Sequence, residues 1–320
     1  MRSERVKQRP VFTVLIFYSL YSSMEAVLGY LGKVDPEGAQ RARSRYACFD
    51  QFGENIQAYG YAASLGLTES CEREVINQLL ELRNRAAEYA GRDGRVAADE
   101  FFFAEQNARL VKNAEEYYRS MFGARKSSWN MRDRHMADTL EQLAGFLAGT
   151  RNRAKIVVWA HNSHLRDARA TEMGEHGEIN VGQLARERYH EQAVLVGFTT
   201  YQGSVIAAFD WDAPAERKRV RPALDDSYEA LFHCIDAARF FLDLRDPSLV
   251  GLSKPRRLER AIGVIYRPES ERSSHYFYAD LPSQFDAVVH FDESQALRPL
   301  ESMPGWEKAQ EAPETFPSGI

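Results

Sequence analysis

The sequence predicts an α/β protein in which a central mixed or parallel sheet is flanked by helices, with a large helical insert or cap in the N-terminal half. Two observations lead to this fold class. Apolar residues recur at helical spacing over residues 20–150, whereas short β-branched runs alternate with helical segments over residues 151–300. Strands that alternate with helices are typical of an α/β sheet. The 320 residues, 44% hydrophobic and 27% charged, suffice for one large globular domain.

Two long helices are expected at the end of the N-terminal half. Residues 99–122 place apolar side chains such as Leu110 and Val111 at helical spacing. The next helix is predicted to begin at an N-cap, Asn130, to carry Asp133 as an acidic residue of its first turn, and to end at Gly149. Together they form much of the predicted cap over the sheet.

The C-terminal half is predicted to begin with a strand that is buried on both faces. Residues 155–160 form a continuous apolar run rich in β-branched residues, which is typical of such a strand. Residues 192–200 and 204–209 predict two strands joined by a hairpin at residues 201–203. Further strands are expected at residues 239–242, 261–266 and 286–290, with helices at 179–189 and 227–236.

Composition and charge exclude several function classes. The net charge of −5 argues against a nucleic-acid-binding protein, and the basic stretch at residues 216–221 is interpreted as a solvated loop. The apolar run at residues 11–21 is too short to span a membrane and is followed by no cleavage pattern of a signal peptide. The three widely spaced cysteines predict neither a disulfide framework nor a metal knuckle. We therefore expect a soluble, cytoplasmic protein that binds neither nucleic acid nor membrane.

The most informative candidate residues follow the predicted strand at residues 155–160. Ligands bind beyond the carboxyl ends of strands in open α/β sheets, and His161 and His164 occupy that position. Either imidazole could act as a general acid or base near neutral pH. Two other interpretations stay open: both could be polar loop residues, or both could join Asp167 as ligands of a hydrolytic zinc ion.

Two helical segments supply further candidates. Arg132 lies on the apolar face of its helix, where a guanidinium needs a carboxylate or a substrate oxyanion as its partner, and Asp133 is either a site residue or a helix cap. Glu105 and Asn107 lie among aromatic residues, as in a helix that lines an apolar pocket or in a core helix with a polar edge. The sequence contains no Gly-x-Ser-x-Gly nucleophile elbow, no P-loop and no Gly-rich dinucleotide turn, so a Ser-His-Asp hydrolase of the usual type is disfavoured.

Taken together, these segments resemble the erythromycin esterase family over residues 18–301. The resemblance is carried in colinear order by Tyr18-Ser19-Leu20, Ser23-Met24-Glu25-Ala26-Val27, Tyr46-Ala47-Cys48-Phe49, Ala104-Glu105-Gln106-Asn107-Ala108, Trp129-Asn130-Met131-Arg132-Asp133, Trp159-Ala160-His161-Asn162-Ser163-His164, Gly182-Gln183-Leu184, Glu259-Arg260-Ala261-Ile262-Gly263-Val264-Ile265-Tyr266-Arg267-Pro268 and Ser274-His275-Tyr276-Phe277. It implies one erythromycin esterase-like domain over residues 1–303, followed by a flexible tail at 304–320.

The resemblance also implies metal-independent hydrolysis of a small-molecule carboxylic ester or lactone, without a cofactor. In named bacterial members the substrate is a macrolide and the reaction gives antibiotic resistance; the physiological substrate and the oligomeric state here stay open. Carried over by motif, the catalytic residues are His161, His164 and Arg132. The substrate-binding residues are Asn162, Glu105, Asn107, Trp129 and Asp133.

One departure from the family pattern concerns the N-terminus. The family signature Gly-Glu-x-x-His-Gly, which supplies its principal histidine, has no match before residue 18, and Gly174-Glu175-His176-Gly177 has the wrong spacing and place. We therefore expect the first family strand to be missing and hydrolysis by this chain to be weak, since a general base typically contributes about a hundred- to ten-thousand-fold. A metal-dependent hydrolase and a non-catalytic binding module are the alternatives.

Overall fold

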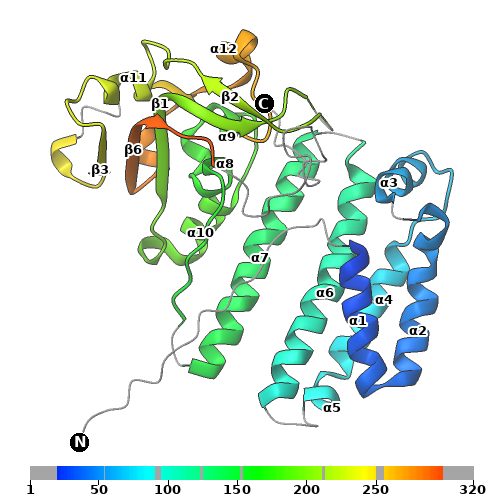
Figure 1. Ribbon diagram of the computed structural model, residues 1–320. Helices are drawn as coiled ribbons and strands as arrows, with labels where there is room; N and C mark the ends of the chain where they lie inside the picture. The colour runs from blue at the N-terminus through cyan, green and yellow to red at the C-terminus, as the bar shows by residue number, and fades with distance from the viewer. Residues whose placement is uncertain are drawn as a thin grey trace, which may run out of the picture.

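The computed structural model describes residues 20–53, 55–90, 95–122, 125–151, 154–210, 213–249 and 256–297. The apolar run before Leu20 and the tail predicted from residue 304 lie outside these residues. Within them, the chain forms a helical N-terminal half and a C-terminal half that contains the strands (Figure 1).

The helical half consists of antiparallel helices that pack around one apolar core. Helix α6 contacts α1, α3, α4, α5 and α7, and so lies at the centre of the bundle (Figure 1). Fully buried Val27, Phe49, Tyr59, Val111 and Ala114 belong to this core. The helices are α1 (Leu20–Val34), α2 (Pro36–Tyr46), the 3₁₀ turn η2 (Ala47–Phe52), α3 (Ile56–Ser64), α4 (Glu72–Asn84), α5 (Ala86–Ala90), α6 (Arg95–Ser120) and α7 (Arg125–Arg151).

The last of these helices differs from its predicted limits. Helix α7 begins at Arg125 and continues to Arg151, so Asn130 is not its N-cap and Gly149 does not end it. The side chain of Asn130 instead bonds outside its helix, to the backbone of residues 177 and 179. The prediction failed because a side chain that can cap a helix can equally bind a neighbouring loop.

The cysteine prediction is also corrected in this half. Cys48 and Cys71 form a disulfide with a Cα–Cα distance of 5.9 Å, whereas Cys234 is an exposed free cysteine. Twenty-three residues separate the paired cysteines, and only the packing of η2 against the start of α4 brings them together. Spacing along the sequence could not reveal this proximity.

The C-terminal half is built on a mixed four-stranded sheet in the order β2-β1-β6-β3. Strands β1 and β6 are parallel, while β2 and β3 pair antiparallel at the two edges. A second sheet pairs β4 with β5 antiparallel. The strands are β1 (Val196–Ala207), β2 (Glu216–Val220), β3 (Arg239–Asp243), β4 (Arg257–Arg260), β5 (Tyr276–Ala279) and β6 (Ala287–Ser294). The predicted fold class, a mixed sheet flanked by helices with a helical N-terminal half, is confirmed.

Short helices cover one face of this sheet. Phe232, Phe285 and Val288 form a buried cluster there, whereas Phe198 and Phe241 on the other face are 44% and 64% exposed. The helical segments of this half are α8 (Asn162–Leu165), η3 (Ala168–Ala170), α9 (Glu172–Glu175), α10 (Val181–Tyr189), η4 (His190–Gln192), α11 (Tyr228–His233), η6 (Pro268–Ser270), α12 (Glu271–Ser274) and α13 (Leu281–Gln284). The predicted helices at residues 179–189 and 227–236 correspond to α10 and α11.

The predicted hairpin at residues 201–203 is wrong, because β1 runs without a turn through these residues. Gly203 has a positive φ of 127°, and a Cβ atom there would collide with the backbone oxygen of Ser294 in β6. A glycine inside a strand often marks close approach of a neighbouring backbone, and that is its role here.

The predicted buried strand at residues 155–160 is not a strand in the structure, and its side chains are not buried. These residues have no regular secondary structure, and Val157 and Trp159 are 91% and 83% exposed. A strand needs a neighbour that satisfies its backbone groups, and no described strand pairs with this segment. Two smaller predictions also fail. Residues 216–221, predicted to be a loop, mostly form edge strand β2. The strand expected at residues 261–266 is not formed, and β4 ends just before it, at Arg260.

Among the described helices, none is both long and apolar enough to cross a membrane.

Candidate active site

The structure joins two of the predicted residues, Asp133 of α7 and His164 of α8, in a hydrogen-bonded pair. Nδ1 of His164 lies 2.9 Å from Oδ1 and 3.1 Å from Oδ2 of Asp133. Asp133 is fully buried, while 18% of the His164 side chain remains exposed. Since a carboxylate can only accept, Nδ1 of His164 carries the proton, and Nε2 makes no hydrogen bond to any described residue. This arrangement orients one imidazole with a basic nitrogen available for chemistry.

Trp129 lies one turn before Asp133 on α7 and contacts both His164 and Arg132. The His164 ring stacks on the indole with centroids 4.8 Å apart and planes 5° apart. The guanidinium carbon of Arg132 lies 4.7 Å from the centre of the same indole, and Arg132 is only 5% exposed. The three predicted residues Trp129, Arg132 and His164 are thus brought together, with the aromatic ring fixing the plane of the imidazole.

The loop before α10 locks this face of α7 in place. Nε1 of Trp129 donates to the carbonyl oxygen of Ile179 at 2.8 Å, and Oδ1 of Asn130 accepts from the backbone N–H of Ile179 at 2.9 Å. The N–H of Val181 donates to Oδ1 of Asp133 at 3.1 Å. Because residues 129, 130 and 133 share one helical face, one loop can bind all three. The buried carboxylate of Asp133 therefore accepts from two donors, Nδ1 of His164 and the N–H of Val181.

His161 has a different role from His164 in the structure. Its Nδ1 accepts from the N–H of Ser163 at 3.2 Å and lies 2.8 Å from the Ser163 hydroxyl, so Nε2 carries the proton and donates to the carbonyl oxygen of Ile262 at 2.9 Å. Desolvation by the surrounding protein lowers the pKa of His161 to about 4, although part of the residue is open to solvent. Both nitrogens are engaged, so His161 caps α8 and ties it to the chain at Ile262.

Asn162 binds the sheet. Its amide nitrogen donates to the carbonyl oxygen of Phe198 at 2.7 Å, and its amide oxygen accepts from the N–H of the same residue at 3.1 Å. One side chain thus satisfies the backbone groups that a neighbouring strand would bind. Asn162 positions α8 against β1, and its amide is not available to a ligand while these bonds persist.

Glu105 and Asn107 lie away from the Asp133–His164 pair. Glu105 binds Nε of Arg83 at 2.8 Å, and the Asn107 amide donates to the carbonyl oxygen of Phe103 in its own helix. A hydrogen bond between α6 and α7 joins Asn113 to His135, two residues after Asp133, at 2.7 Å. Glu105 precedes Asn113 by eight residues, about 12 Å along the helix axis. The structure therefore does not bring these two predicted residues to the site.

The alternative zinc site is not assembled in the described part of the chain. Asp167 caps η3 and pairs with Arg169 at 2.7 Å and with Arg186 at 3.6 Å. The two nitrogens of His161 face Ser163 and Ile262. No group of three or more His, Cys, Asp or Glu side chains with a geometry for metal occurs among the described residues.

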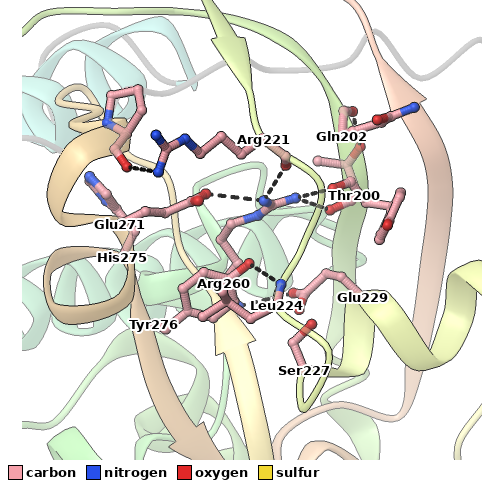
Figure 2. Close-up of polar contacts among 12 residues, drawn as sticks. Thr200, Gln202, Arg221, Leu224, Ser227, Glu229, Arg260, Glu271, His275 and Tyr276 are labelled. Carbon is pink, nitrogen blue, oxygen red and sulfur yellow. Dashed lines mark hydrogen bonds and ion pairs between the residues drawn. The ribbon is translucent and has the colours of Figure 1, made fainter.

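Figure 2 shows a second buried polar cluster, centred on Arg260 of β4. Its guanidinium donates to the carbonyl oxygens of Thr200 and Tyr201, both at 2.6 Å, and to Glu271 at 3.1 Å. The N–H of Arg260 donates to Oε1 of Glu229 at 3.0 Å. The cluster joins β1, β4, α11 and α12. Sequence reasoning found the motif around residues 259–268 but assigned no role to its buried charges.

Glu229 is the least satisfied member of this cluster. It is 1% exposed, and its Oε2 has no hydrogen-bond partner among the described residues. Burial raises its pKa to about 7, against the lowering effect of Arg260. No sequence pattern could supply this signal, since it depends on the burial of the Glu229 carboxyl group in the folded protein.

The family model for erythromycin esterase matches residues 15–294. This chain belongs to the erythromycin esterase family. The match covers both the α7 face that carries Asp133 and the segment that carries His164, so the resemblance stated from the motifs is confirmed.

Individual relatives agree with the family. "Putative hydrolase YbfO" of Bacillus subtilis (strain 168) is 30% identical over 123 residues, which are 36% of this chain and 26% of that protein. A succinoglycan biosynthesis protein has a similar structure, with a TM-score of 0.71 and 19% identity over 91% of this chain and 67% of its own. A histidine-to-asparagine mutant of erythromycin esterase EreC, in its open conformation, has a TM-score of 0.59 and 16% identity over 87% of this chain and 66% of its own. These structures share the fold, and the chain spans about a quarter of the curated relative that it matches.

Proposed function

We propose that this protein hydrolyses a carboxylic ester or lactone of a small molecule, with His164 as the general base. The observation that carries the proposal is the Asp133–His164 pair, in which Nδ1 is held at 2.9 Å by a fully buried carboxylate. A carboxylate in this place fixes the tautomer and stabilises the imidazolium that forms during the reaction.

The proposed reaction needs no further co-reactant than water. Nε2 of His164 takes a proton from a water molecule while the water oxygen attacks the ester carbonyl carbon. The tetrahedral intermediate then expels the alcohol, whose oxygen takes the proton back from Nε2. Arg132, beside the same indole, would offer positive charge to the oxyanion, as preorganised donors do in acyl transfer.

The other predicted residues take supporting roles in this proposal. His161 and Asn162 hold α8 at Ile262 and Phe198, so that His164 keeps its place against Trp129. Only one imidazole therefore acts as a base, and turnover by this chain is expected to be slow. A general base alone contributes about a hundred- to ten-thousand-fold. Macrolide lactones, which the name of the EreC neighbour suggests, are one substrate class within the proposal.

A panel of aryl esters and lactones tests the proposal with purified protein. We expect slow hydrolysis of the most activated esters, a loss of at least about a hundredfold in His164→Asn, and an unchanged rate in the control His233→Asn, whose ring is 44% exposed and pairs with Asp292. His161→Asn should lower the melting temperature, because the bond to Ile262 is lost, while most of the hydrolysis rate is kept. Hydrolysis that is unaffected by His164→Asn, or lactone binding with no turnover of any ester, would contradict the proposed reaction.

A further inference from the structure

One face of the four-stranded sheet carries exposed aromatic side chains. Helices α11 and α13 contribute Phe232 and Leu281 to the buried cluster on the opposite face. Sheets of α/β proteins usually have both faces covered, so that apolar side chains are kept out of water. On the face away from α11, Phe198, Phe241 and Phe291 are instead exposed. Contiguous exposed apolar patches mark interaction sites.

These side chains belong to an apolar row that crosses three neighbouring strands. Strands β1, β6 and β3 lie side by side (Figure 1), and Val289 of β6 pairs in register with Phe198 on one side and with Phe241 on the other. Residues that pair in register point to the same face of a sheet, so the three side chains are neighbours. Trp159 lengthens the row beyond β1, because its exposed ring lies 5.4 Å from the Phe198 ring, centroid to centroid.

Opposite charges stand at the two ends of edge strand β3, on either side of this row. Successive side chains of a strand point to opposite faces, so Arg239 and Asp243 share the face of Phe241. Both are exposed. Asp243 pairs with Arg245 at 3.0 Å in a contact that is open to solvent, and a carboxylate has lone pairs for a further donor. The face therefore has an apolar centre, a cation at one end and an anion at the other.

The neighbouring strand β6 repeats this asymmetry in size. Phe291 lies in register beside Arg239, and Ala287 lies in register beside Asp243. A bulky side chain thus flanks the row on the arginine side, and a small one flanks it on the aspartate side. After half a turn about the row, such a face is complementary to itself in size and in charge. The charges favour a second copy over an unrelated chain, since they match a partner that carries the same pair in the opposite direction.

We propose that this face binds a second copy of the chain, about a two-fold axis that lies along the apolar row. The rotation places Phe241 of one copy over Phe241 of the other and reverses the strand direction between the stacked sheets. Arg239 then faces Asp243 of the second copy, and Phe291 faces the second copy's Ala287. The same patch serves on both copies, as in the isologous dimers that are the commonest soluble oligomers. Sheets that pack face to face lie about 10 Å apart, with interdigitated side chains.

Sedimentation velocity of the full-length chain over a concentration series measures this association. We expect a reversible dimer whose dissociation constant rises at least about a hundredfold in Phe241→Ser, because the apolar contact is lost twice in each dimer. Leu67→Ser is the matched control, since this apolar side chain is also exposed but lies in the helical half, and its loss should leave the dimer unchanged. Circular dichroism checks the fold of each variant.

Charge reversal tests the position of the axis. Arg239→Asp and Asp243→Arg each bring like charges together twice in the dimer, so each should weaken it by about tenfold or more. The double variant Arg239→Asp/Asp243→Arg has opposite charges across the axis again and should recover most of the original affinity.

Association is measured without substrate, so the result does not depend on ester hydrolysis. A chain that stays monomeric at every concentration overturns the proposed dimer and leaves the face to a different partner. A dimer that Phe241→Ser does not weaken, or one that the double charge variant does not restore, overturns it as well. If Phe241→Ser does not fold, the charge variants decide, because Arg239 and Asp243 are exposed.

Discussion

Replacing Glu229 by glutamine should stabilise the protein at alkaline pH. Glu229 is buried beside Arg260, its Oε1 accepts the Arg260 N–H at 3.0 Å, and its Oε2 has no partner among the described residues (Figure 2). Glutamine keeps the carbonyl acceptor for Arg260 and carries no charge. The substitution therefore removes the cost of a buried carboxylate and preserves the bond that positions it.

The magnitude follows from the pKa of Glu229, which burial raises from its ordinary value of 4.5 to about 7. The folded state then binds the proton more tightly than the unfolded state. The stability from this group is present in full below pH 4.5 and is lost as the pH rises through 7. A difference of about 2.5 (7 minus 4.5) corresponds to about 3 kcal/mol, most of which is lost between pH 5 and pH 8.

Urea unfolding at pH 5 and at pH 8 measures the effect. The free energy of unfolding of Glu229→Gln, relative to the original protein, should increase by about 2 kcal/mol between the two pH values. Glu269→Gln, at an exposed position of η6, is the control and should change little. An equal dependence on pH in Glu229→Gln and in the original protein would show that the buried carboxyl does not titrate in this range.

Three further predictions follow from the structure. Asp133→Asn should lower ester hydrolysis by about a hundred- to ten-thousand-fold while circular dichroism shows an intact fold, because the amide oxygen stays on the Val181 N–H and the amide NH2 then faces Nδ1 of His164, which favours the wrong tautomer; a loss below tenfold would refute the orienting role. Gly203→Ala should lower the free energy of unfolding by more than about 1 kcal/mol, since φ is 127° and the added Cβ would meet β6; an unchanged urea midpoint would contradict this. Serine in place of Cys48 should cost about 3 kcal/mol at pH 7 by losing the bond to Cys71, and an oxidised sample that shows two free thiols more than Cys234 alone would contradict the bond.

The helical half could be predicted from sequence because its signal is local. Apolar residues such as Leu110 and Val111 recur within one helix, and their low exposed fractions of 9% and 0% follow from the packing of that same face. The disulfide between Cys48 and Cys71 could not be predicted, since it depends on how two separate helical segments meet. The predicted start of helix α7 was wrong for a related reason, because the Asn130 side chain binds the backbone of a loop at residues 177 and 179.

The strands were predicted less well because a strand is defined by its neighbours. The apolar run at residues 155–160 has the composition of a buried strand, yet Trp159 is 83% exposed where no described strand pairs with it. In the same way, Gly203 predicts a turn by residue type alone, whereas its partner Ser294 lies 91 residues further along the chain. Register and neighbours are tertiary properties, and they override local preference.

The candidate site was found in part. The sequence placed His164 at a strand end and Asp133 and Arg132 on one helix, but it gave the two histidines equal roles. The structure separates them, since both nitrogens of His161 are engaged and only one nitrogen of His164 is. Glu229 escaped notice because the burial of a charged side chain has no sequence signature.

The nitrogen chemical shifts of the His164 ring test the central claim most directly. In the neutral ring, the account predicts a protonated Nδ1 held by Asp133 at 2.9 Å and an unprotonated Nε2 that faces the reaction. Asp133→Asn should move the proton to Nε2. A neutral His164 that already carries its proton on Nε2 in the unaltered protein would contradict the account, because no basic nitrogen would then be free to activate water.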